Sequence, residues 1–161
     1  DSSMLNPQIA LPHEVDNVID VQEAAMKVDK AYIGSCTGGR LFDLKVAAKI
    51  LEGKKISSKC KLIVSPASQK TWVQANKLGL LEILADAGAI ILAPTCGACL
   101  GLHSGLLGDG ESCISTTNRN FKGRMGSPNS YVYLGSPATV AASSLVGEIS
   151  DPRNFLKEVI Q

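Results

Sequence analysis

The sequence lacks an excess of charge of either sign. Its 161 residues carry 16 basic and 15 acidic side chains, which gives a formal net charge of +1. Nucleic acid or an anionic membrane surface is not expected as a partner, because both attract proteins with strongly basic faces. The composition still allows a local site for a small anion.

The sequence also lacks a long apolar run. No stretch approaches the ~20 apolar residues that a membrane-spanning helix needs, and no basic-then-apolar signal peptide precedes the first predicted strand. We therefore expect a cytoplasmic protein. The first residue is Asp1 instead of Met, which favours a processed piece or an excised domain, and the length fits a single domain.

An even set of regularly spaced cysteines is missing as well. The five cysteines are Cys36, Cys60, Cys96, Cys99 and Cys113. In a chain long enough to form a substantial core, an odd number disfavours a disulfide framework. Metal binding or redox chemistry is the favoured use of such thiols.

What the sequence does contain is a regular alternation of strand and helix patterns. Short apolar segments predict strands at residues 30–35, 60–66, 89–94, 113–116 and 130–136, and periodic segments ended by glycine predict helices at 41–53, 69–79, 80–88 and 137–147. This alternation predicts an α/β fold, a three-layer αβα architecture with a mainly parallel sheet and helices on both faces. We expect residues 1–29 to form an extended leading segment or linker, and residues 30–161 to form one α/β domain.

The unusual residues follow the predicted strands. Cys36 follows the first strand, Cys96 and Cys99 follow a later one, and the polar stretch 116–124 follows another. Loops after parallel strands gather at the carboxyl edge of the sheet, where ligands bind. The three loops can therefore build one site.

The first loop, IGSCTGGR at residues 33–40, places Cys36 among three glycines. Glycine lets the backbone approach a bound group closely, and a turn that opens a helix offers amide donors to negative charge. The stretch fits an anion or cluster cradle, and it equally fits a tight turn around a buried cysteine.

The second loop contains TCGAC at residues 95–99, which has several interpretations. A thioredoxin-type redox pair would open a long helix, and Gly101 makes one improbable here. A structural zinc site commonly needs a second cysteine pair, which the sequence lacks. Together with Cys36 the pair supplies three thiolates, which suits an iron–sulfur cluster with one iron left open as a Lewis acid. The simple packing of a turn is the remaining alternative.

The third loop, TTNRNFKGR at residues 116–124, contains Arg119 and Arg124. Two guanidinium groups at this spacing can clamp carboxylates through paired, charge-assisted hydrogen bonds. Solvated surface arginines are the alternative, and they are the commoner case.

Taken together, three stretches resemble the signatures of the aconitase superfamily. They are IGSCTGGR, PTCGACLG and STTNRNFKGRMGS, in the family's order and at comparable separations, and the closing LGSPATVAASSLVGEI is also similar. Within the superfamily the pattern is most similar to the large subunits of isopropylmalate dehydratases and their homoaconitase-like relatives. The resemblance covers nearly the whole chain and implies the superfamily's iron–sulfur α/β domain.

The resemblance implies a cofactor and its ligands. A 4Fe–4S cluster would be held by Cys36, Cys96 and Cys99, and its open iron would bind the hydroxyl of a hydroxy di- or tricarboxylate. Dehydration followed by rehydration would then move that hydroxyl to the neighbouring carbon, as in a hydro-lyase.

The resemblance also implies the substrate contacts. Asn118 would lie beside the cluster, and Arg119 and Arg124 would hold the substrate carboxylates. Gly38 departs from the asparagine that many members have there, and the identity of the substrate stays open among isopropylmalate, homocitrate or homoaconitate, dimethylmalate and citrate.

Three further residues stay outside this assignment. Cys60 and Cys113 match no ligand position and are interpreted as packing residues. His103 follows the cysteine pair, and both a structural and a catalytic role are open.

The family's large subunit has further domains, and a swivelling domain, often a separate small subunit, adds catalytic residues. We expect this chain to be the cluster-proximal domain, to partner the small subunit and the remaining large-subunit domains, and to be inactive alone. Two other classes stay open, a dithiol redox protein and a subunit-docking module without a cluster.

Overall fold

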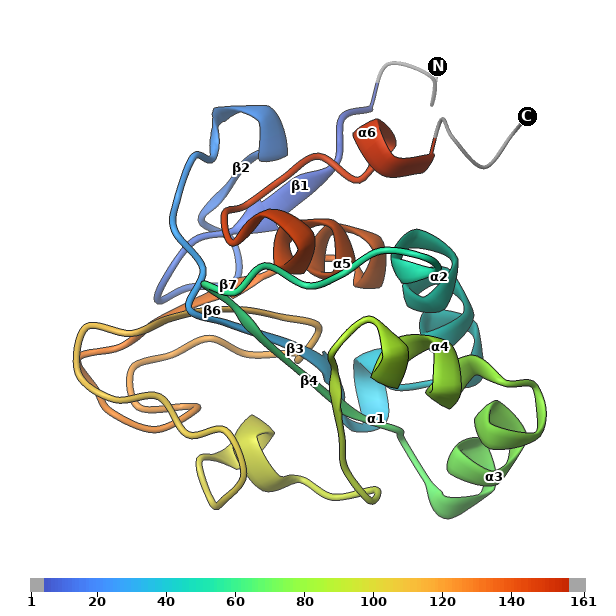
Figure 1. The fold of residues 1–161 in the computed structure, drawn as a ribbon. Coiled ribbons are helices and arrows are strands. Elements are labelled where there is room, and N and C mark those ends of the chain that lie inside the picture. Colours follow the sequence, from blue (N-terminus) through green and yellow to red (C-terminus); the bar gives the residue numbers. More distant parts are fainter. Residues whose placement is uncertain (1–4, 157–161) are drawn as a thin grey trace.

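The computed structural model describes residues 5–156, and seven strands in this range form one sheet (Figure 1). In chain order the strands are β1 (Gln8–Ala10), β2 (Val18–Asp20), β3 (Lys30–Gly34), β4 (Lys61–Ser65), β5 (Ile90–Ile91), β6 (Ser112–Ser115) and β7 (Tyr131–Leu134). Their spatial order is β2-β1-β7-β6-β3-β4-β5. The five strands from β7 to β5 run parallel, whereas β1 and β2 join antiparallel at one edge. The predicted α/β fold with a mainly parallel sheet is confirmed.

The helices connect these strands. They are α1 (Ser35–Gly38), α2 (Leu41–Leu51), α3 (Gln69–Lys77), α4 (Leu80–Asp86), α5 (Pro137–Val146) and α6 (Arg153–Leu156), with 3-10 helices η2 (Val21–Glu23) and η3 (Gly97–Leu100). Local sequence sets the helix ends. The Ser68 hydroxyl caps α3 by accepting from the Thr71 amide at 3.2 Å, and α5 starts with proline and ends at Gly147.

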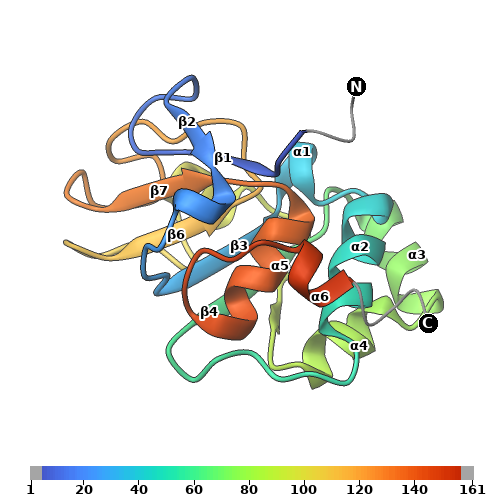
Figure 2. The same ribbon diagram turned by 90° about the horizontal axis from the view of Figure 1, so that it is seen from above.

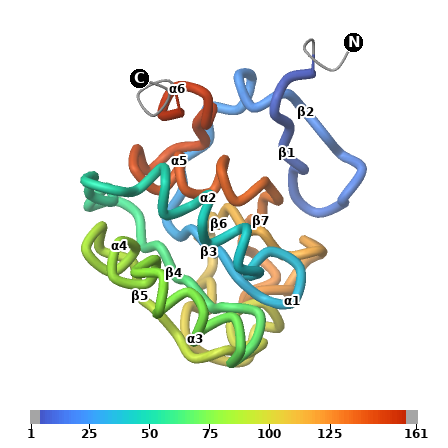
Figure 3. The backbone as a smooth tube through the Cα atoms, turned by 90° about the vertical axis from the view of Figure 1, so that its right-hand side faces the viewer, coloured from blue at the N-terminus to red at the C-terminus, as the bar shows by residue number. Residues whose placement is uncertain are grey.

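The larger part of the core lies between the sheet and helices α2, α4 and α5, which cover one face (Figures 2 and 3). Ala31 and Ile33 of β3 point into this layer, and Leu44 and Ile50 of α2 pack against it with no exposed surface. Alternate residues of the strand share one face, and residues three or four apart share one face of α2, so the apolar residues of β3 and those of α2 are buried against each other.

The opposite face of the sheet is covered mainly by long loops. A second core cluster lies there, formed by Tyr32, Ile63, Ala98, Cys99, Leu107, Cys113, Met125 and Val132. Within residues 5–156 the helical cover of this face is short, since η3 is four residues long and Gly101, with φ of +68°, ends it. The helical layers predicted for both faces are therefore unequal, and the loops that carry the candidate site take the place of one.

Residues 5–29 add two strands to the sheet, β1 and β2. Ala10 of β1 pairs with Leu134 of β7, and Ile9 is buried at 1% exposure. The division into residues 1–29 and 30–161 stays a prediction, and residues 1–4 and 157–161 of those ranges lie outside the described part.

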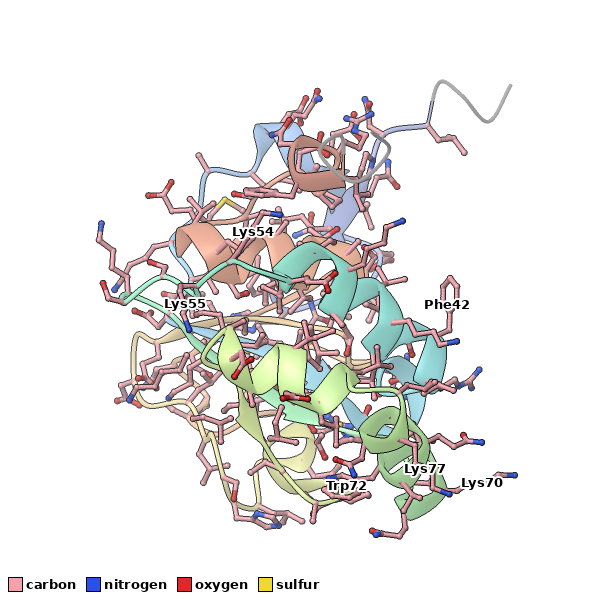
Figure 4. All side chains as sticks on the ribbon, turned by 45° about the vertical axis from the view of Figure 1, so that its right-hand side comes forward. Phe42, Lys54, Lys55, Lys70, Trp72 and Lys77 are labelled. Atoms are coloured by element: carbon pink, nitrogen blue, oxygen red, sulfur yellow. The ribbon has the colours of Figure 1, made fainter. Side chains whose placement is uncertain are left out.

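The outer surface of the helical layer carries charged side chains and a few exposed apolar ones, among them Phe42, Val73 and Val146. Phe42, on the first turn of α2, points away from the body and is 74% exposed, and Lys70 and Lys77 of α3 also point outward (Figure 4). None of the helices between residues 5 and 156 has the length and apolar character to cross a membrane. The cytoplasmic location stays a prediction.

Candidate functional site

Cys36 lies on a sharp turn at the carboxyl end of β3. The strand ends at Gly34, and Ser35 adopts φ of +65°, a left-handed conformation that costs free energy in a residue other than glycine. The single turn of α1 starts there, and Cys36 is exposed. The turn therefore presents the thiol at the edge of the sheet.

Thr116, at the carboxyl end of the neighbouring strand β6, holds this turn. Its buried hydroxyl accepts from the Gly34 amide at 3.0 Å and lies 3.2 Å from the Gly38 carbonyl oxygen. The Thr37 hydroxyl donates to the Thr116 carbonyl at 3.4 Å. The first and third loops identified in the sequence thus meet through hydrogen bonds.

Gly38 has no room for a side chain. A Cβ there would stand 2.2 Å from Oγ1 and 2.3 Å from Cβ of Thr116. Any larger residue at this position would therefore have to displace Thr116.

The second loop is anchored by Ser65 at the end of β4. Its fully buried hydroxyl accepts from the Thr95 amide at 3.3 Å and lies within hydrogen-bond distance of the Ala93 and Thr95 carbonyls. Cys96 follows directly and is exposed at the start of η3, whereas Cys99, inside η3, is buried at 5% exposure.

Arg124 connects the third loop to the second. Its Nη2 donates a hydrogen bond to the Cys99 sulfur at 3.5 Å, and its guanidinium lies over the Phe121 ring, 5.4 Å from the centroid. This contact brings together two residues that the sequence assigned to one site.

Asn118 and Arg119 are exposed beyond β6, and Arg119 donates to the Asn118 carbonyl at 2.8 Å. Both lie on the site's third loop, and their predicted substrate contacts stay predictions. Between them and Arg124 lies Asn120, which sequence reasoning overlooked. Its buried side chain donates to the Leu11 carbonyl at 2.7 Å and so ties the third loop to the leading segment. No local pattern distinguished this asparagine from Asn118.

The remaining singled-out residues have ordinary surroundings. Cys60 and Cys113 are buried in the two core clusters, as their interpretation as packing residues predicted. His103 is exposed, and its ring nitrogens lie 3.2 Å from the Thr95 hydroxyl and 3.0 Å from the Ser104 hydroxyl. This histidine supports the cysteine loop from outside.

The expected ligand set is only partly assembled. Among residues 5–156, no group of three His, Cys, Asp or Glu side chains lies close enough together to hold a metal ion, so ligation by Cys36, Cys96 and Cys99 stays a prediction.

The donor chemistry nevertheless fits an iron–sulfur cluster. The three thiols are free, and thiolates are the ligands such clusters take. Three buried side-chain nitrogen or oxygen atoms in the described part have no hydrogen-bond partner, and two of them, the Tyr32 hydroxyl and Arg124 Nε, belong to residues beside Cys99. Unsatisfied buried polar atoms around thiols are expected where a bound group is to complete the site.

Comparison with known proteins agrees with this arrangement. The model of the aconitase family (aconitate hydratase) matches residues 10–147. Large subunit 2 of 3-isopropylmalate dehydratase from Archaeoglobus fulgidus is 53% identical over 97% of this chain and 38% of its own length. The probable methanogen homoaconitase large subunit of Methanosarcina mazei is 54% identical over 96% of this chain and 39% of its own length.

A third relative, large subunit 1 of 3-isopropylmalate dehydratase from Thermotoga maritima, is 48% identical over 97% of this chain and 38% of its own length. The chain thus spans about two fifths of the length of these curated relatives. The match covers every loop of the candidate site, and the chain belongs to the aconitase family.

Proposed function

We propose that this chain is the cluster-binding domain of a hydro-lyase large subunit of the isopropylmalate dehydratase type. The observation that carries the proposal is the contact between Arg124 and Cys99, because it joins the arginine loop to the cysteine loop at the carboxyl edge of the sheet. The turn of Cys36, fixed to the same edge by Thr116, supplies the third thiol.

In this proposal Cys36, Cys96 and Cys99 hold a 4Fe–4S cluster. The bound cluster supplies an open iron that acts as a Lewis acid on the substrate hydroxyl. The protein's own contribution is electrostatic, since the Arg124 guanidinium lies against a ligand sulfur and offsets negative charge on it.

The proposed substrate is a hydroxy di- or tricarboxylate. Arg119 and Arg124 would hold its carboxylates and Asn118 would lie beside the reacting carbons, which limits the geometries that the bound substrate can adopt. The names of the relatives favour isopropylmalate, and hence leucine biosynthesis, with homoaconitate as the alternative.

The proposed partners are a small subunit and the remaining large-subunit domains. Four large apolar side chains are exposed on the loops around the site, namely Leu100, Leu102, Leu106 and Phe121. Several exposed apolar residues close to one site are typical of a surface that another domain or subunit covers. On this basis we expect the isolated chain not to isomerise a hydroxy acid, which a direct assay with and without the small subunit checks.

Anaerobic reconstitution with iron and sulfide tests the cluster. Wild-type protein should acquire the broad visible absorption of a 4Fe–4S centre, and replacement of Cys36, Cys96 or Cys99 by serine should remove most of it. Cys60→Ala is the matched control, because Cys60 is a free thiol in the opposite core cluster. Full cluster uptake by the Cys36→Ser variant would overturn the proposal.

The redox alternative gives a different result in the same experiment. A protein that takes up no iron but reversibly oxidises Cys96 and Cys99 to a disulfide would be a dithiol redox protein. Mass spectrometry after alkylation of the remaining thiols distinguishes the two.

A further inference from the structure

Tyr32 occupies an unusual position for a tyrosine. It lies in the middle of β3, and its side chain points to the face of the sheet opposite the helical layer, whereas its neighbours Ala31 and Ile33 point into that layer. Tyr32 shares its cluster with Cys99, and only 1% of its surface is exposed.

The ring reaches along the strand toward the site. A Cβ on Gly34 would stand 3.0 Å from Cε1 and 3.0 Å from Cζ of Tyr32, so the end of the ring that bears the hydroxyl lies at the level where β3 ends. Cys36 follows two residues later. The phenol oxygen is therefore directed at the edge of the sheet that carries the three thiols.

The hydroxyl has no hydrogen-bond partner among residues 5–156. The neighbouring Ser65 hydroxyl is engaged with the backbone of Ala93 and Thr95. A buried hydroxyl without a partner costs about 1–3 kcal/mol. Phenylalanine would fill the same space without this cost, so the hydroxyl needs an acceptor that residues 5–156 do not provide.

The hydroxyl is also suited to donate. The hydroxyl of a tyrosine, whose ordinary pKa is about 10, carries its proton at neutral pH and can donate it to an acceptor. Cys99 lies in the same buried cluster as the phenol ring. Because cysteine sulfur lies beside the ring, a sulfur atom that carries negative charge is the acceptor that best suits this hydroxyl.

We propose that Tyr32 is a positioning residue that donates a hydrogen bond from its hydroxyl to a sulfur of the iron–sulfur cluster, on the side held by Cys96 and Cys99. This inference rests on the proposed function. A hydrogen bond to sulfur stabilises the more negative, reduced cluster, and such bonds help to set cluster reduction potentials. Tyr32 thereby raises the reduction potential of the cluster.

The test compares Tyr32→Phe with wild-type protein after anaerobic reconstitution of the full chain. Tyr133→Phe is the matched control, because Tyr133 is also buried in the sheet but lies in the cluster of the helical face. We expect all three proteins to bind equal iron and sulfide. The midpoint potential, followed by electron paramagnetic resonance of the reduced cluster, should shift to a more negative value only in Tyr32→Phe.

A midpoint potential unchanged by Tyr32→Phe overturns the inference while the proposed function stands. Absence of a cluster in wild-type protein overturns both. If Tyr32→Phe does not fold, the tyrosine vibrational doublet of a protein that carries both Tyr131→Phe and Tyr133→Phe decides the matter, because Tyr32 is then the one tyrosine left in the sequence. Cluster loading should change that doublet from the form of a free hydroxyl to that of a donor, and an unchanged doublet contradicts the proposal.

Discussion

Gly38 and Thr116 lie in direct contact, with the Gly38 carbonyl oxygen 3.2 Å from the Thr116 hydroxyl and no space for a Cβ between the two residues. The contact joins positions 78 residues apart in the chain. Because Cys36 precedes Gly38 by two residues, the contact also fixes how far the Cys36 turn stands from β6.

Replacing Gly38 by alanine should therefore displace the turn. The new Cβ would meet both the side chain and the backbone carbonyl of Thr116, whose buried hydroxyl is held by the Gly34 amide. We expect a loss of about 1–3 kcal/mol in the free energy of unfolding, measured in urea, together with reduced cluster uptake. Gly108→Ala is the control, because Gly108 is exposed and a Cβ there meets nothing closer than 3.6 Å. Equal effects of the two substitutions would contradict the steric explanation.

Asn120 and Arg119 are adjacent, but truncating each to alanine should affect a different property, stability for Asn120 and substrate binding for Arg119. Asn120→Ala removes the donor to the Leu11 carbonyl, and we expect the free energy of unfolding to fall by about 1–3 kcal/mol. Arg119→Ala removes an exposed side chain and should change stability by less than about 0.5 kcal/mol. For a complex with the proposed partner domains, the proposed function predicts instead that Arg119→Ala raises the KM for the proposed hydroxy-acid substrate. Thermal unfolding and steady-state kinetics on both variants separate the two roles.

The five thiols should differ in their reaction with iodoacetamide. Cys36 and Cys96 are exposed and should be modified first in the native, cluster-free protein. Burial raises the pKa of Cys60 to about 12 and raises the pKa of Cys113 as well, so both stay protonated and unreactive near neutral pH. Peptide mass spectrometry over time checks the order. Modification of Cys113 as fast as Cys36 in folded protein would show that the second core cluster is open.

The ion pair between Lys30 and Glu111 should make stability depend on pH. Lys30 donates to Glu111 and to the Leu106 carbonyl, the latter at 2.7 Å, and so anchors the loop before β6. The hydrogen bond from Lys30 and the Gly108 amide hold the pKa of Glu111 below its usual value. A carboxyl with a lowered folded-state pKa stabilises the protein above its unfolded pKa of about 4.3, and this contribution is lost as the pH falls below that value.

Urea unfolding at a series of pH values from 7 downward checks this prediction. Glu111→Gln should lower stability at pH 7 and flatten the decline in the acid range. Lys30→Met should do the same, and the double variant should be little worse than either single one, because the two residues share one interaction. Additive effects would show that the pair is not coupled.

Much of the fold was predictable because its signals are local. Ser68 and the Ser136–Pro137 pair mark helix starts through hydrogen bonds to residues three positions away, and short apolar runs mark β3 and β7. The uneven cover of the sheet was not predictable, since nothing local in residues 92–111 says that these loops replace a helical layer.

The pairing of β1 with β7 was not predictable either. The short segment around Ile9 shows no strand pattern of its own, and it becomes a strand because it reaches the free edge of β7 and is held there through Asn120. Contacts between distant segments override weak local preference in such cases.

By itself the sequence determined the order of strands and helices, the three loops with their thiols and arginines, and the family. These depend on residue type and spacing within single segments. Only the tertiary structure decided which residues meet, namely Gly38 with Thr116 and Arg124 with Cys99. It also left the Tyr32 hydroxyl, in the cluster of Cys99, without a hydrogen-bond partner among residues 5–156. The reason is physical, because hydrogen bonds and steric contacts require proximity, and proximity between distant segments exists only after the sheet has formed.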